Sequence, residues 1–204
     1  MQHVRLSFMT TDPDRIGDAV RYLEDEARSL VESQPGNLGM SLEVNPELGA
    51  AVVESHWVSG DAMRDNEKAV APVFEKAAGR GGGTASAERY ELASFVQAAR
   101  PRSGSGVRFT RSDLETADID DAIANYEDTA IPWLVATDGF CRAVMFVNRR
   151  TRQAVNETLW LDEDALVGSR SAEAGIRADA VAATSAAIRA LEEYRLAFSS
   201  ARRL

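Results

Sequence analysis

The chain has 204 residues, of which 45% are hydrophobic and 27% are charged, which is typical of a folded globular protein and excludes a disordered chain or a fibre. Its formal net charge of −9 argues against a nucleic-acid or anionic-membrane surface, because phosphate binding needs a basic field. No run of about 18 apolar residues is present to form a membrane-spanning helix.

The first half of the chain predicts the order strand, helix, strand, strand, helix, strand. Alternating apolar residues over 3–10 indicate a strand, and helical spacing of apolar residues follows over 12–33. The pair Asp12-Pro13 is typical of a helix start. We then expect strands over 38–45 and 49–58, a helix opening at Ser59 or Gly60, and a strand near 88–96.

The second half predicts the same order after a polar linker at 100–106. The glycine-rich stretch 79–83 lacks the Gly-Lys-Ser/Thr ending of a phosphate loop and precedes a strand, so we expect a flexible connection or lid. The expected elements of the second half are strands over 107–111, 140–148, 153–161 and 191–198, a helix over 117–136, and helical pieces within 162–188.

A sequence repeat relates the two halves. Residues 4–63 and 107–166, compared without a gap, are identical at 17 of 60 positions, and a slip of one residue then aligns 88–93 with 192–197. We therefore predict a tandem duplication with one repeat over 1–98, a linker over 99–106 and a second repeat over 107–204. The β-α-β-β-α-β order is the ferredoxin-like arrangement of the α+β class. Its bare sheet face must be covered, which two fused copies achieve by packing sheet against sheet.

The end of the third strand in each repeat carries a short recurring motif. It reads Glu-Ser-His-Trp-Val-Ser-Gly-Asp-Ala at 54–62 and Glu-Thr-Leu-Trp-Leu-Asp-Glu-Asp-Ala at 157–165. With the repeat order, this motif resembles the antibiotic biosynthesis monooxygenase family. The resemblance implies an α/β barrel that is normally built by two chains, here an intramolecular pseudo-dimer. Members of this family include cofactor-free oxygenases of aromatic polyketides, haem-degrading enzymes and domains with no known activity.

The resemblance implies a catalytic pair, Asn156 and Trp160. Both lie on one strand face with Thr158, because side chains alternate along a strand. In family members that oxygenate anthrones, an Asn and a Trp at this spacing line the pocket. The family's Tyr beyond the Trp is absent, since Leu166 stands in that region. A core Trp with a hydrogen-bonded Asn remains the alternative interpretation.

The second repeat is the better candidate for a site. It carries Tyr126, Trp133 and Asn156 where the first repeat has aliphatic residues. An apolar pocket with a few converging polar groups suits a small aromatic ligand. We also expect Pro132 either to kink the helix there, which would open the pocket, or only to end an irregular helix. The predicted substrate-binding residues are Tyr126, Trp133, Thr158 and Trp57, the counterpart of Trp160.

Charged residues that recur in both repeats predict structural ion pairs. We expect Arg5 to pair with Glu54, and Arg108 with Glu157, on the sheet face that the repeats cover. A nearby histidine, His56, is interpreted as a satisfied structural residue rather than a base.

We predict neither a metal nor a cofactor. The two histidines, His3 and His56, and the single cysteine, Cys141, form no zinc pattern or Cys/His pair. Haem-degrading relatives need a histidine on the helix after the Trp, where this chain has Asn66-Glu67 and Ser169-Arg170, so haem degradation is disfavoured.

Two functions are carried forward. The first is a cofactor-independent monooxygenase, an oxidoreductase acting on a small aromatic or polyketide-like substrate in the second repeat, with no general base identified. The alternative is a non-catalytic small-molecule-binding or accessory protein. The expected partner is a small aromatic molecule, with no nucleic acid and no membrane, and a further homodimer stays open. One cysteine and a start without a signal-peptide pattern predict a cytoplasmic protein.

Overall fold

A computed structural model describes residues 1–114 and 118–201 of the chain. Contacts divide the chain into two compact units, unit 1 formed by Met1–Glu91 with Leu196–Leu204, and unit 2 formed by Leu92–Arg195. The repeat boundaries given above describe sequence similarity rather than compactness and remain a prediction. The expected residue Ala117, and positions 202–204 of the expected second repeat, lie outside the described residues.

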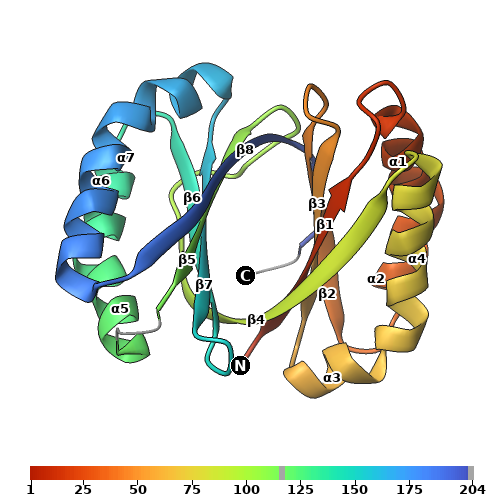
Figure 1. Cartoon of the computed structure of the whole chain (residues 1–204), viewed down its shortest axis with the longest axis horizontal. Helices are drawn as coiled ribbons and strands as arrows, with labels where there is room; N and C mark the ends of the chain where they lie inside the picture. The colour runs from red at the N-terminus through yellow and green to blue at the C-terminus, as the bar shows by residue number, and fades with distance from the viewer. Residues whose placement is uncertain (115–117, 202–204) are drawn as a thin grey trace. The chain divides into compact units, whose positions relative to one another are not determined.

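Unit 1 is an antiparallel sheet with helices on one face. In the sheet β1 lies between β3 and β4, and β2 pairs with β3. Figure 1 shows α1, α2 and α4 together on one side of these strands. The elements are β1 (His3–Thr10), α1 (Ile16–Tyr22), the π-helical turn η1 (Leu23–Ala27), α2 (Arg28–Glu32), β2 (Asn37–Asn45), β3 (Ala50–Trp57), α3 (Gly60–Asp65), α4 (Glu67–Arg80) and β4 (Thr84–Gln97), whose residues from Leu92 on belong to unit 2.

Unit 2 has the same plan. Its strand β5 lies between β7 and β8, and β6 pairs with β7. Helices α5, α6 and α7 cover one side of this sheet (Figure 1). The elements are β5 (Gly106–Asp113), α5 (Ile119–Asn125), the π-helical turn η2 (Tyr126–Ala130), α6 (Ile131–Ala136), β6 (Phe140–Asn148), β7 (Gln153–Trp160), α7 (Glu163–Thr184) and β8 (Ala187–Ser199). The predicted α+β class with two ferredoxin-like units is confirmed.

Side-chain caps explain where the helices begin. The hydroxyl of Ser59 accepts a hydrogen bond from the backbone N–H of Ala62 (3.1 Å), and the carboxylate of Asp162 does the same for Ala165 (2.9 Å). The expected start at Ser59 is confirmed. The expected helix start at Asp12-Pro13 is wrong, because α1 begins at Ile16 and the Asp12 carboxylate accepts from the N–H of Asp14 in the turn before it.

The π-helical turns interrupt the first helix of both units. In unit 2 the turn η2 is followed by Ile131 and then Pro132, and η1 occupies the matching place in unit 1 without a proline. A π-helical turn at this place therefore does not require a proline, and the kink expected at Pro132 stays a prediction.

The glycine-rich stretch 79–83 ends helix α4 and packs against β1. Gly82 has a φ of +74°, which glycine adopts at low cost, and a Cβ on Gly83 would meet the carbonyl oxygen of Thr10. The backbone N–H of Asp12 also donates to the carbonyl of Gly81 (2.9 Å). The expected flexible lid is therefore wrong, since this turn is packed and hydrogen-bonded.

The expected ion pairs are wrong because their members lie on opposite sheet faces. In unit 1 the strand register places Arg5 opposite Ser55 and Glu54 opposite Leu6. Arg5 therefore points toward α4, where its Nε lies 3.5 Å from Glu67. Glu54 faces the other way and contacts His56 at 3.1 Å, so this histidine is buried with a partner.

Unit 2 repeats this difference. Arg108 lies opposite Thr158 in the register and points toward α7, whereas Glu157 on the other face pairs with Arg142 at 3.1 Å. Across the described residues, no helix has the length and apolar character needed to cross a membrane.

Candidate functional site

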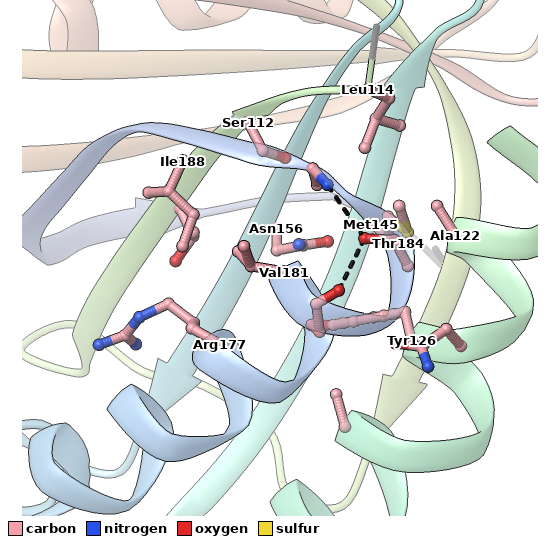
Figure 2. Close-up of a pocket in the computed structure, with 15 residues that line it drawn as sticks. Ser112, Leu114, Ala122, Tyr126, Met145, Asn156, Arg177, Val181, Thr184 and Ile188 are labelled. Carbon is pink, nitrogen blue, oxygen red and sulfur yellow. Dashed lines mark hydrogen bonds between the residues drawn. The ribbon is translucent and has the colours of Figure 1, made fainter. Parts of the chain in front are cut away.

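Two small pockets lie in unit 2 beneath the C-terminal half of α7. Each has a volume of about 70 Å³, and because they share lining residues we treat them as one site, the α7 pocket (Figure 2). Both are lined by Thr110 and Asn156 of the sheet, by Tyr126 and Ala130 of η2, and by Arg177 and Ala180 of α7.

The pocket exists because α7 packs tightly only along its first half. The fully buried residues of this helix are Leu166, Ser169 and Glu173. Beyond them, the side chains turned toward the sheet are small or only partly buried, and they leave space above β5 and β7. Those that line the pocket are Ile176, Arg177, Ala180, Val181 and Thr184.

Two polar atoms of the pocket are buried and have no hydrogen-bond partner among the described residues. They are the hydroxyl oxygen of Tyr126 and the amide oxygen Oδ1 of Asn156. The rest of each side chain is only half-buried. A buried polar atom without a partner is costly and is normally satisfied by water or a ligand. The pair therefore indicates where a bound molecule would form hydrogen bonds.

The hydroxyl of Tyr126 can donate a hydrogen bond to a ligand. Burial raises the pKa of Tyr126, and the negative charges of Glu173 and Glu157 raise it further. Its hydroxyl therefore keeps its proton at neutral pH, while Oδ1 of Asn156 can only accept. The pocket offers one donor and one acceptor within mostly apolar walls, which include Leu114, Met145 and Val181.

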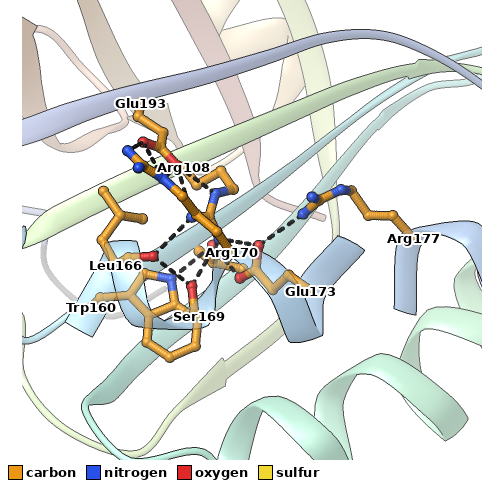
Figure 3. A network of polar contacts seen from close by, with 9 residues as sticks. Arg108, Trp160, Leu166, Ser169, Arg170, Glu173, Arg177 and Glu193 are labelled. Carbon is orange, nitrogen blue, oxygen red and sulfur yellow. Dashed lines mark hydrogen bonds and ion pairs between the residues drawn. The ribbon is translucent and has the colours of Figure 1, made fainter. Parts of the chain in front are cut away.

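A charged network, drawn in Figure 3, includes two residues that line the pocket, Glu173 and Arg177. Arg108 is buried and donates to the carbonyl of Leu166 (2.9 Å), to Ser169 (2.9 Å) and to Glu193 (2.7 Å). Arg108 also donates to Glu173. The Glu173 carboxylate accepts a further hydrogen bond from the guanidinium of Arg177 (3.0 Å). The carboxylate that lines the pocket is thus held between two arginines.

The network reaches the predicted catalytic tryptophan through one threonine. Nε1 of Trp160 donates to the hydroxyl of Thr158 (3.2 Å), and that hydroxyl donates to Glu173 (3.3 Å). Trp160 is fully buried and packs edge-on against Phe140, with ring centroids 5.8 Å apart. It lies in the core behind Thr158 rather than on the pocket surface.

The predicted site residues are thus divided among three places. Asn156, Tyr126, Trp133 and Thr158 meet in the α7 pocket. Trp160 supports that wall from behind. Trp57 belongs to the core of unit 1, where its Nε1 donates to Ser55 (3.2 Å).

The sequence pattern did not single out Glu173 and Arg177, although a signal was present. Ser169, Glu173 and Arg177 are spaced four residues apart, so they share one face of a helix. Polar residues on the face that should be buried indicate a polar network or a site. The segment was expected to be helical only in pieces, so this face was not recognised.

Comparisons with known proteins establish the fold. No family model matches the chain. It is 25% identical over 176 residues to the uncharacterized protein Rv2557 of Mycobacterium tuberculosis, covering 86% of this chain and 79% of that protein.

Solved structures are similar over almost the whole length. An anthrone oxidase-like protein shares 12% identity with a TM-score of 0.68, covering 97% of this chain and 92% of its own. A ferredoxin-fold protein of Listeria monocytogenes related to antibiotic biosynthesis monooxygenases shares 10% identity with a TM-score of 0.56, covering 96% and 94%. The fold is that of the antibiotic biosynthesis monooxygenase-like proteins.

Haem, which some members of this fold degrade, does not fit the residues present. Both histidines of the chain, His3 and His56, belong to unit 1, so the α7 pocket has no histidine to act as an axial ligand. A volume of about 70 Å³ in each part of the pocket is also too small for a porphyrin.

Proposed function

We propose that this chain is a cofactor-independent monooxygenase whose site is the α7 pocket of unit 2 and whose substrate is a small hydroxylated aromatic molecule. The observation that carries the proposal is the pair of unpartnered buried atoms, the Tyr126 hydroxyl and Oδ1 of Asn156. A ring hydroxyl can donate to the Asn156 amide and accept from Tyr126, which would satisfy both.

The size of the pocket favours a single ring. A dry cavity of roughly 150 Å³ accommodates benzene. The two parts of the α7 pocket, about 70 Å³ each, are comparable to it when they join. A polycyclic substrate would require the C-terminal half of α7 to move outward.

The reaction needs no electron from the protein. A phenol reacts with dioxygen to give a quinone and water, so that one oxygen atom enters the ring and the other leaves as water. The ring carbon and the hydroxyl each lose one hydrogen, and the substrate supplies all four electrons. The chain would hold the developing oxyanion with Tyr126 and the ring with Trp133. Glu173, the acidic residue of the described lining, would accept the proton.

A specific observation favours a second candidate, a non-catalytic binding protein. Both Arg108 and Arg177 pair with Glu173, so two ion pairs hold this carboxylate inside the fold. If Glu173 keeps both arginine partners when a ligand binds, the pocket binds that ligand without converting it.

Oxygen uptake and ligand binding, measured together, test the proposal. Anthrone and single-ring phenols are supplied to the wild type and to Asn156→Ala, with Gln97→Ala, an exposed amide, as control. We expect oxygen uptake with a phenol that falls by at least about tenfold in Asn156→Ala and is unchanged in the control. Equal rates in all three proteins would rule out the site. Calorimetric binding without oxygen uptake would favour the second candidate.

A further inference from the structure

A triad of two arginines joined by one glutamate occurs in both units, with the glutamate and one arginine interchanged in position. In unit 1, Glu67 of α4 lies 3.5 Å from Arg5 and 2.7 Å from Arg89. In unit 2, Glu193 of β8 lies 2.7 Å from Arg108 and also pairs with Arg170.

The members of the two triads correspond in position. Residues 67 and 170 differ by the repeat spacing, and the strand registers place Arg89 opposite Arg5 and Glu193 opposite Arg108. The helix position holds Glu67 in unit 1 and Arg170 in unit 2. The strand position holds Arg89 in unit 1 and Glu193 in unit 2. The triad therefore serves the fold, since both units keep it in one form or the other.

Unit 2 adds a second charged pair that unit 1 does not have. At the repeat spacing, Glu173 and Arg177 stand where unit 1 has Val70 and Phe74, both only 1% exposed. The ring of Phe74 lies under the guanidinium of Arg5, 5.0 Å away. Apolar residues thus fill this place in unit 1, which shows that this type of fold does not require the Glu173–Arg177 pair.

With the added pair, the ion-pair network of unit 2 contains more arginines than glutamates. Three arginines, at 108, 170 and 177, face two glutamates, at 173 and 193. Another nearby carboxylate, that of Glu157, is paired with Arg142 and leaves this balance unchanged. Of this network, Arg177 and Glu173 line the pocket, so Arg177 is the arginine that a bound anion could reach.

Arg177 is the member of the network able to change its partner. Its side chain is 20% exposed, against 1% for Arg108, and it lines both parts of the pocket. If Arg177 turned away from Glu173, that carboxylate would still be held by Arg108 and Thr158.

We infer that the α7 pocket recognises a small aromatic monoanion, a carboxylate or a phenolate, and that Arg177 binds its negative charge in place of Glu173. The inference rests on the pocket assigned under the proposed function. A planar guanidinium can give two parallel hydrogen bonds to such an anion, while the ring occupies the apolar walls beside Tyr126.

Calorimetric titration with benzoate and with its neutral isostere benzamide tests the charge preference. We expect the wild type to bind benzoate at least about tenfold more tightly than benzamide. Arg177→Gln should weaken benzoate binding about tenfold and leave benzamide binding unchanged, and Arg177→Lys should retain part of the preference. Arg21→Gln, which removes an exposed helical arginine of unit 1, is the control and should bind as the wild type does.

The outcomes separate this inference from the proposed function. If both compounds bind equally well and Asn156→Ala weakens both, the pocket stands and the charge preference is wrong. If neither binds, both proposals fall. An unchanged preference in Arg177→Gln, checked as folded by circular dichroism, also overturns the role of Arg177, and Arg177→Lys provides the same test should the glutamine variant not fold. Titration of 4-nitrophenol above and below its own pKa then distinguishes phenolate from carboxylate recognition.

Discussion

Buried polar groups of unit 2 fall into two kinds, those with partners inside the fold and those without. The guanidinium of Arg108 finds carboxylate, hydroxyl and carbonyl partners, whereas the hydroxyl of Tyr126 and Oδ1 of Asn156 find none among the described residues. A buried group with partners inside the fold adds to stability, whereas a buried polar atom without one lowers it, and under the proposed function a ligand would satisfy the two open atoms.

Removing an unsatisfied hydroxyl should therefore not destabilise the protein. We predict that Tyr126→Phe leaves the free energy of unfolding unchanged or raises it by up to about 1 kcal/mol, while weakening the binding of a ring hydroxyl. Tyr90→Phe is the matched control, because that hydroxyl donates to Glu88 (2.6 Å) and its loss should cost about 1 kcal/mol. Chemical denaturation of both variants measures the difference, and a larger loss in Tyr126→Phe would contradict the assignment.

The free energy of unfolding at acidic pH should depend on the ionisation of Glu193. Burial alone would raise its pKa, but hydrogen bonds from Arg170 and Arg108 outweigh burial and lower the pKa. Between the lowered folded pKa and the unfolded value of about 4.3, the unfolded chain binds more protons, so stability falls as the pH drops through this window. We predict a flatter profile below about pH 4.3 in Glu193→Gln than in the wild type, measured by denaturation across pH. Identical slopes would show that the carboxylate is not held this way.

At the scale of elements, helix α7 shows what the sequence could and could not predict. The sequence predicted helical pieces within 162–188, whereas α7 runs unbroken over Glu163–Thr184 with Gly168 and Gly175 inside it. A Cβ on either glycine would meet nothing within 4 Å, so both face open space and cost only the entropy of a helical glycine. Because separate helical pieces were expected, the polar residues that α7 turns toward the sheet were not recognised as one face of a helix.

Strand register is the second feature that the alternation of side chains along a strand does not predict. The sequence correctly assigned opposite faces to neighbouring residues within β1 and within β3. Which face of one strand matches which face of the next depends on pairing, and a shift of one residue exchanges the faces. The expected pair of Arg5 with Glu54 failed on this point, although both residues are buried as expected.

A larger side chain in the space under α7 should raise stability and prevent ligand binding. Ala180 lines both parts of the pocket, so Ala180→Leu places three more carbons in a cavity of about 70 Å³. We predict a gain in stability of about 1 kcal/mol together with loss of ligand binding. Ala174→Leu, on the exposed side of the same helix, should change neither property. A fall in the melting temperature of Ala180→Leu alone would mean that the space is not available.

At the scale of the whole molecule, the compact units are not contiguous in sequence. The end of β8 packs on unit 1, where the backbone N–H of Ser200 donates to the carbonyl of Met40 (2.8 Å) and Phe198 joins the core cluster. The predicted tandem duplication rests on matches between residues in the same sequence order. It does not reveal which core the last residues of a strand complete, since that depends on contacts far apart in the chain.

This packing predicts that one residue near the C-terminus stabilises unit 1. The ring of Phe198 lies 4.9 Å from the guanidinium of Arg28 and against the core of unit 1. We expect Phe198→Ala to lower the free energy of unfolding by about 2 kcal/mol. Leu191→Ala, at an exposed position of the same strand, is the control and should be neutral. Equal effects of the two substitutions would indicate that the strand end contributes nothing specific.

The interchanged triads allow a test of the duplication as a physical relation between the two units. Arg170→Glu alone places two carboxylates together, and Glu193→Arg alone places three guanidiniums together, so each should destabilise the protein. The double variant recreates in unit 2 the arrangement that unit 1 has in Glu67 and Arg89, and Arg108 would then contact the helix glutamate as Arg5 does. We predict that the double variant recovers most of the lost stability, seen as a favourable coupling energy in a double-mutant cycle of denaturation measurements. The same interchange at Asp18 and Arg21, an exposed helical pair, should give almost no coupling. Additive losses at 170 and 193 would mean that the two networks, though alike in position, are held together by different surroundings.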